Sequence, residues 1–216
     1  MDGDADIAAV GALLAEPARA SVLLALADGR SLAASMLAAE AGVAASTASH
    51  HLARLVDAGL VRVESRGRHR YFSLAGPQVG ELIEAVARVA PPKPVTSLRE
   101  GTRAHAVRYA RSCYDHLAGR LGIAVADALC DDDFAITAAG ARRLHAIGVD
   151  VRTGDHARAC RDWTEQRDHI AGPLGTELLS ALVQHGWLRR DARTRAVRVT
   201  EAGAAELPRR LHVELP

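Results

Sequence analysis

Residues 45–60 read ASTASHHLARLVDAGL, and this stretch decides the fold of the first half of the chain. Its apolar residues recur at the spacing of one helical face: Ala48, Leu52, Leu55 and Val56. The opposite face carries short polar and basic side chains: Ser46, Thr47, His50 and Arg54. A helix with one buried side and hydrogen-bond donors on the other suits a DNA major groove. An ordinary amphipathic surface helix has the same pattern, so the flanking segments must decide.

The flanking segments predict a winged helix-turn-helix. Helices are expected over 7–15, over 18–27 and from the N-cap Ser31 to Ala41. The turn Gly42-Val43-Ala44 then leads into the helix 46–58, and two helices joined by a short glycine-containing turn form a helix-turn-helix. Segments 61–65 and 69–74 read as β-strands around an arginine-rich turn at 66–68. We therefore expect a mainly α fold with a basic hairpin, or wing, after the helix-turn-helix.

Charge is distributed unevenly along the chain. The 216 residues include 27 Lys and Arg against 26 Asp and Glu, which gives a net charge of only +1. Residues 46–73 nevertheless hold an excess of arginine, whereas residues 1–45 are acidic. A basic patch on a nearly neutral protein indicates a local polyanion partner.

Composition excludes several other classes of protein. Hydrophobic residues make up 49% of the chain, yet no apolar run approaches the ~20 residues of a membrane span. The start of the sequence is acidic, unlike a signal peptide, and three cysteines do not suit a secreted disulfide framework. We expect a cytoplasmic protein with no membrane partner.

The segment STASHHLARLVDAGLVRVESRGRHRYFSL (46–74) resembles the recognition helix and wing of ArsR-type bacterial repressors. EPARASVLLAL (16–26) resembles their second helix, and the resemblance covers about residues 6–90. It implies a homodimeric transcriptional repressor that binds a palindromic operator in double-stranded DNA and leaves it when an effector binds. The alternative is a winged-helix module that contacts proteins or small molecules and no operator.

We predict that the DNA contacts come from the helix and the wing. Thr47 and His50 are expected nearest the base edges, and the arginines mostly at phosphates. The full set of predicted contacts is Ser46, Thr47, Ser49, His50, Arg54, Arg66, Arg68 and Arg70.

A helix expected over 77–90 has an apolar side formed by Val79, Leu82, Ile83 and Val86. This side either closes the core of the domain or, as the resemblance implies, pairs with the first helix across a dimer axis. The proline-rich segment 91–97 then reads as a stiff linker. We expect a DNA-binding and dimerisation domain at 1–90 and a C-terminal regulatory domain at 98–216.

The C-terminal part contains an internal repeat. DHLAGRLG (115–122) recurs as DHIAGPLG (168–175), and each copy continues toward a segment in which a threonine precedes a helix, at Thr137 and Thr200. The second copy has an additional hairpin expected over 187–195. The two halves predict a mostly helical, pseudo-symmetric domain with winged-helix character in its last part.

The metal sites of the resembling family are missing at their usual places. The helix expected at 32–41 has no cysteine, and the helix 77–90 has neither Asp nor His. Any effector site is therefore expected in the C-terminal domain, and its cofactor stays unknown. A helix expected over 99–118 places Cys113 and His116 one turn apart, and Cys160 and His169 are available to complete a tetrahedral metal site.

Other uses of these residues are open. Free cysteines often pack as small apolar residues, and this reading is preferred over a metal bound by Cys113 and Cys160. The cysteines also suit thiol-redox sensing, and Trp163 suits either a small-molecule pocket or the core. No phosphate-binding glycine loop, nucleophile elbow or His-Glu-x-x-His motif is present, so we do not expect an enzyme.

Overall fold

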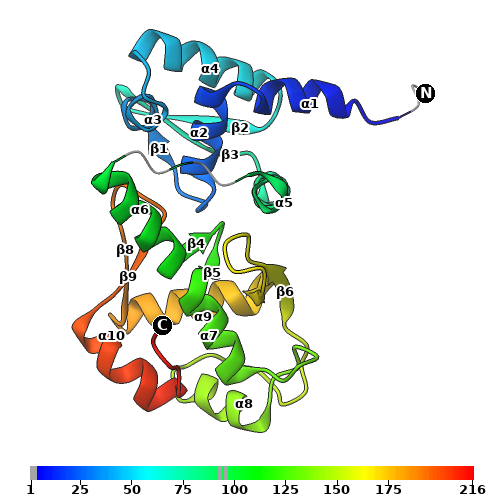
Figure 1. The fold of residues 1–216 in the computed structure, drawn as a ribbon, viewed down its shortest axis with the longest axis vertical. Coiled ribbons are helices and arrows are strands. Elements are labelled where there is room, and N and C mark those ends of the chain that lie inside the picture. The colour runs from blue at the N-terminus through cyan, green and yellow to red at the C-terminus, as the bar shows by residue number, and fades with distance from the viewer. Residues whose placement is uncertain (1–3, 92–93, 95–96) are drawn as a thin grey trace. The chain divides into compact units, whose positions relative to one another are not determined.

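The structure, a computed structural model, describes residues 4–91, 94 and 97–216 (Figure 1). The chain forms two compact units, Met1–Ile83 and Glu84–Pro216. Most of the expected 91–97 linker lies outside the described residues, and the boundary between the units falls before it, at residues 83 and 84.

The first unit is a small helical domain closed by a three-stranded sheet. Its helices are α1 (Ile7–Leu14), α2 (Pro17–Leu26), α3 (Ala34–Ala41) and α4 (Ala45–Asp57). The antiparallel sheet has the order β1 (Leu32–Ala33), β3 (His69–Leu74), β2 (Val61–Arg66). Helix α5 (Pro77–Val89) follows and crosses the boundary between the units. The core is made of leucines from α2, α3 and α4 packed with Phe72 of the wing.

One expectation about this unit is wrong. Ser31 is not the N-cap of the third helix, because Leu32 and Ala33 pair with Phe72 and Tyr71 of β3. Helix α3 therefore begins at Ala34, after Ala33, which makes no side-chain capping hydrogen bond. The burial of Leu32 in the sheet decides this, since its non-local pairing outweighs the local capping signal.

The second unit repeats one supersecondary arrangement. The first copy is the hairpin β4 (Arg111–Cys113) and β5 (His116–Ala118), then α7 (Gly119–Leu129) and α8 (Ala138–His145). The second is β6 (Arg158–Arg161) and β7 (Asp168–Ala171), then α9 (Gly172–Gln184), β8 (Leu188–Arg190), β9 (Val197–Val199) and α10 (Glu201–Glu206). Helix α6 (Leu98–Tyr109) precedes the first copy, and the short π-helix η1 (Leu207–Leu211) follows the second.

The two copies pack crosswise, so that each helix lies on the hairpin of the other copy. Helix α7 packs against β7, and α9 packs against β5. Glycines allow this approach: a Cβ at Gly122 would lie 3.6 Å from the Cβ of His169, and one at Gly175 would lie 2.9 Å from the Cβ of His116. The pseudo-symmetric pairing predicted from the repeat is thus present in the packing.

Thr137 and Thr200 cap α8 and α10 as expected, each accepting a hydrogen bond from a backbone N–H three residues later. The last part of the unit has winged-helix character. Gly186, with φ 71°, follows the end of α9 and precedes the β8–β9 hairpin, just as Gly59, with φ 70°, follows the end of α4 and precedes the wing.

The expectation of a helix over 99–118 is wrong. Helix α6 ends at Tyr109, and the following residues form the β4–β5 hairpin, whose turn holds Tyr114 at φ 56°. Hydrogen bonds from distant residues fix the extended backbone, because the N–H of Ser112 donates to the carbonyl of Arg195 at 2.9 Å. Cys113 and His116 are therefore opposite each other across two strands, not one helical turn apart.

Within the described part of the chain, no single helix is long and apolar enough to cross a membrane. One bent pair, α1 with α2, meets that test by length and composition together.

Candidate nucleic-acid interface and candidate metal centre

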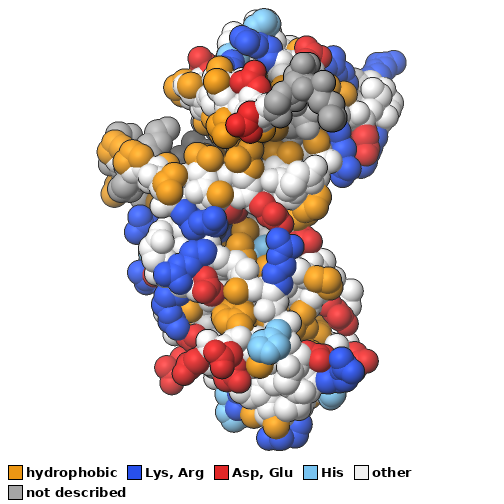
Figure 2. Space-filling view, turned by 90° about the vertical axis from the view of Figure 1, so that its right-hand side faces the viewer, with side chains coloured by type: hydrophobic (Ala, Val, Ile, Leu, Met, Phe, Trp, Pro, Cys, Tyr) orange, Lys and Arg blue, Asp and Glu red, His pale blue; other side chains and the backbone are white. Residues whose placement is uncertain are grey.

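Helix α4 exposes the polar face predicted from its sequence. Ala48, Leu52 and Leu55 are buried, whereas Ser46, Thr47, His50 and Arg54 are exposed. Ser49 is exposed too, and its hydroxyl donates to the carbonyl of Ala45 at 2.9 Å. Figure 2 shows histidine and basic side chains together at the surface of the first unit. The exposed face therefore offers hydroxyl, imidazole and guanidinium groups on a rigid helix.

The wing carries its arginines on an ordered hairpin. Gly67 and Arg68 form the two-residue loop between β2 and β3. Gly67 has φ 63°, and such a loop requires a positive φ at its first residue. The guanidinium of Arg66 lies 5.5 Å from the centre of the Tyr71 ring, and that of Arg70 lies 5.4 Å from the Phe72 ring. Arg66 also pairs with Glu64 at 2.9 Å, so part of its charge is already neutralised.

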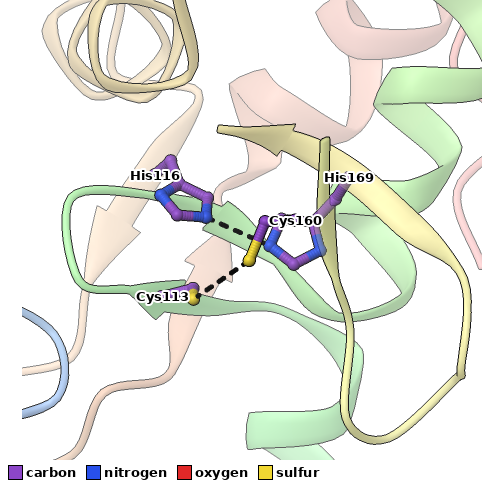
Figure 3. Close-up of side chains that lie close together, drawn as sticks. All are labelled: Cys113, His116, Cys160 and His169. Atoms are coloured by element: carbon purple, nitrogen blue, oxygen red, sulfur yellow. Dashed lines mark hydrogen bonds between the residues drawn. The ribbon is translucent and has the colours of Figure 1, made fainter. Parts of the chain in front are cut away.

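In the second unit, four predicted residues come together: Cys113, His116, Cys160 and His169 (Figure 3). Their ligand atoms all lie within 4.8 Å of one another. The Nε2 atoms of His116 and His169 are 3.2 Å apart, and the two sulfurs are 4.0 Å apart. Three of the four residues are buried, and Cys160 is half-buried.

The β-register explains how the chain assembles this cluster. Cys113 is the cross-strand partner of His116 in β4–β5, and Cys160 is the partner of His169 in β6–β7. Directly opposite residues of an antiparallel pair project on the same face. Each hairpin therefore supplies one thiol and one imidazole, and the crosswise packing of the two copies brings the two pairs face to face.

Two carboxylates lie behind the histidines. Nδ1 of His116 donates to Oδ1 of Asp115 at 3.1 Å, and Nδ1 of His169 lies 3.8 Å from Oδ2 of Asp162. Sequence reasoning missed both carboxylates. The repeat pointed to Asp168 as the counterpart of Asp115, but Asp168 lies beside Arg161, and Asp162 comes from the unrepeated loop between β6 and β7.

Asp162 also joins the two copies. Its carboxylate accepts hydrogen bonds from the Arg111 guanidinium at 2.9 Å and from the Gly119 backbone N–H at 2.8 Å. Both side chains of the Arg111–Asp162 pair are fully buried. Burial opposes ionisation of Asp162, but Arg111 and these hydrogen bonds outweigh it and hold its pKa below the ordinary value.

The surroundings of the two cysteines shift their pKa values in opposite directions. The hydrogen bond between the sulfurs raises the pKa of the Cys113 thiol and lowers that of Cys160. Burial disfavours a charged His116, but its hydrogen bonds with Asp115 and Cys160 raise its pKa overall. Cys160 is therefore the sulfur on which negative charge is most readily held.

The remaining candidates lie elsewhere. Trp163 is half-buried, and the guanidinium of Arg111 lies 5.0 Å and that of Arg195 5.8 Å from its ring centre. Val79 and Ile83 of α5 are buried, Leu82 is partly buried and Val86 is 38% exposed.

Comparison with known proteins places the chain in a family. A helix-turn-helix domain family model matches residues 14–64. The uncharacterized HTH-type transcriptional regulator YdfF of Bacillus subtilis is 37% identical over 97% of this chain and 99% of its own length. The chain belongs to the HTH-type transcriptional regulators. As a member of these regulators it binds DNA, and the predicted function class is confirmed.

Other relatives of this HTH-type regulator match its N-terminal half. The HTH-type transcriptional regulator CmtR of Mycobacterium tuberculosis is 35% identical over 43% of this chain and 81% of its own length. A homodimeric winged helix-turn-helix domain of a possible ArsR-family regulator from Mycobacterium bovis is 33% identical, covering 40% of this chain and 86% of that domain, with a TM-score of 0.35. The N-terminal half is thus similar in sequence to these HTH-type regulators.

Proposed function

We propose that this regulator is a homodimeric repressor that reads a palindromic operator with α4 and the wing. The observation that supports this most is the exposed row of donors on α4, whose opposite side is anchored in the core by Leu52 and Leu55. Thr47 and His50 contact base edges, and Arg54, Arg68 and Arg70 contact phosphates. Ser46, Ser49 and Arg66 complete the interface.

A palindromic operator requires a dimer, because two half-sites related by a two-fold axis need two recognition helices. Helix α1 is apolar, yet none of its residues is buried, and Ile7 is 80% exposed. Val86 and Val89 of α5 are also exposed, at 38% and 84%. These exposed apolar residues favour dimerisation through α1 and α5.

We assign the regulatory role to the second unit. An effector binds there, and its binding causes the protein to leave the operator. The competing hypothesis is that α4 and the wing contact a protein and not the operator. The two functions differ in the salt dependence of DNA binding, since phosphate contacts release counterions and protein contacts do not.

The test begins with selection of duplexes from a random pool by the full-length protein. We expect an enriched palindrome and an affinity that falls steeply with salt. Arg68→Ala should weaken binding and reduce the magnitude of the salt slope by about 0.9 for each phosphate that the variant no longer neutralises. Arg142→Ala, which removes an exposed arginine from α8 of the second unit, is the matched control and should change neither.

Failure to enrich any sequence, or a salt slope that Arg68→Ala and Arg142→Ala alter equally, would overturn the assignment of α4 and the wing to DNA binding.

A further inference from the structure

We propose that Cys113, His116, Cys160 and His169 bind one soft or borderline divalent cation, with Zn²⁺ as the reference ion, in a closed tetrahedral site. This inference concerns the second unit and does not depend on how the first unit contacts DNA.

The distances already match such a site. Zn–S bonds of about 2.3 Å and Zn–N bonds of about 2.0–2.1 Å place two tetrahedral sulfurs about 3.8 Å apart and two nitrogens about 3.3 Å apart. The observed separations are 4.0 Å for the sulfurs and 3.2 Å for the Nε2 atoms. Two hairpins far apart in sequence therefore hold the sulfur–sulfur and nitrogen–nitrogen separations close to two edge lengths of the required tetrahedron, and all four ligand atoms lie within 4.8 Å of one another.

The histidines are oriented as metal ligands are. A ligating imidazole usually turns its other nitrogen toward a carboxylate, which fixes the tautomer and raises the basicity of the ligating nitrogen. His116 has Asp115 in this position and His169 has Asp162. Both Nε2 atoms then face the centre of the cluster.

Without an ion, the His169 ring is left incompletely satisfied. When both imidazoles are neutral and Asp115 accepts from Nδ1 of His116, Nε2 of His116 has a lone pair and accepts from Nε2–H of His169. Nδ1 of His169 is then unprotonated, and among the described residues it is a buried atom with no hydrogen-bond partner. With a cation at the centre, His169 can carry its proton on Nδ1, on the side of the Asp162 carboxylate 3.8 Å away.

Charge and proton balance are consistent with this. Two metal–sulfur and two metal–nitrogen bonds form, the thiol protons that remain are released to solvent, and the His169 proton moves from Nε2 to Nδ1. Two thiolates neutralise a divalent cation, so the buried site carries no net charge from the ion and its four ligands. Four protein ligands leave no open position for substrate, which suits a structural or sensory ion and not a catalytic one.

The test uses the full-length protein, freed of metal under reducing, anaerobic conditions and titrated with Co²⁺ and then Zn²⁺. We expect one Co²⁺ per chain, with the absorption of a tetrahedral cobalt–thiolate complex, and its loss as Zn²⁺ displaces the ion. Cys160→Ser should abolish the thiolate absorption. Cys130→Ser changes the half-buried cysteine outside the cluster and is the matched control, which should retain it.

A second measurement does not depend on variants. Zn²⁺ should protect Cys113 and Cys160 of the wild-type protein from alkylation, mapped by mass spectrometry, and leave Cys130 unprotected. The proposal is overturned if the wild-type protein takes up no cobalt, if Cys160→Ser binds it as well as wild type does, or if Zn²⁺ protects neither cluster cysteine. Formation of a Cys113–Cys160 disulfide by the reduced protein in air, without metal uptake under any condition, would replace the metal site with a redox pair.

Discussion

The Nε2 atoms of His116 and His169 lie 3.2 Å apart, although 53 positions separate the two residues in the sequence. Each histidine belongs to one copy of the internal repeat, and each approaches a glycine near the start of a helix in the other copy. Their proximity therefore depends on the crosswise packing of α7 and α9, which makes the ligand cluster sensitive to the integrity of the repeat interface.

The carboxylate behind His116 should tune the affinity of the metal site. Asp115→Asn keeps the shape of the side chain and removes its charge, so we expect Zn²⁺ affinity to fall by roughly 10–100-fold while one ion per chain still binds. Competition with a chelator of known affinity measures this. Asp132→Asn, in an exposed loop, is the control; equal losses for the two variants would contradict a direct role of Asp115.

The glycine at the crossing point should be essential for the stability of the second unit. In Gly175→Ala the new Cβ would lie 2.5 Å from the carbonyl oxygen of Ile170 and 2.9 Å from the Cβ of His116. We expect a loss of roughly 1–3 kcal/mol in the free energy of unfolding, measured by denaturant titration.

Gly11→Ala provides the comparison for that loss, because no atom lies within 4 Å of the added Cβ and Gly11 is inside α1. It should stabilise the protein by about 0.5–1 kcal/mol. If Gly175→Ala is as stable as wild type, the close packing of α9 on the first hairpin is wrong.

Base recognition should be separable from phosphate binding. Thr47→Ala and His50→Ala should each reduce the preference for the selected operator over its single-base variants by about 1–3 kcal/mol, because the shortened side chain no longer reaches a base edge. The salt slope should stay the same, since neither side chain neutralises a phosphate. Fluorescence anisotropy on the operator and its variants, at several salt concentrations, tests both statements, and a uniform loss of affinity on all sequences would exclude base readout by these residues.

Dimerisation should depend on α5. Val86→Asp places a charge on a valine that is 38% exposed, and in the proposed interface this charge would be desolvated without a partner, so the protein should become monomeric. Val63→Asp is a close control, because Val63 is also a 38% exposed valine but lies in the wing. Sedimentation velocity distinguishes them: if both variants remain dimeric, α5 does not form the interface.

Metal and operator should be linked if the ion is the effector. We expect Zn²⁺ to weaken operator binding by the wild-type protein by roughly 5–150-fold, and the operator must then weaken Zn²⁺ binding by the same factor. Cys160→Ser should bind the operator equally with and without Zn²⁺. Tight Zn²⁺ binding with unchanged operator affinity would show that the ion is structural and that the effector is another molecule.

Local signals in the sequence are enough to specify almost all of the first unit. The spacing of Leu52 and Leu55, the glycine turns and the arginine hairpin specify α4 and the wing without any knowledge of distant residues. The one misplaced element there, the start of α3, depends on the pairing of Leu32 with Phe72, which is distant in sequence.

In the second unit, tertiary interactions decide the secondary structure of residues 111–118 and the positions of the four clustered residues. Val107, Ala110, Tyr114 and Leu117 have helical spacing, but strand pairing at Ser112 makes residues 111–118 a hairpin. The four clustered residues were predicted as a set, but for the wrong reason, since a helical turn was expected between Cys113 and His116. Cys160 could not be aligned with Cys113 by the repeat, because the loop Asp162–Arg167 separates it from His169. The β-register and the crosswise packing set these positions, and both arise from interactions between residues far apart in the chain.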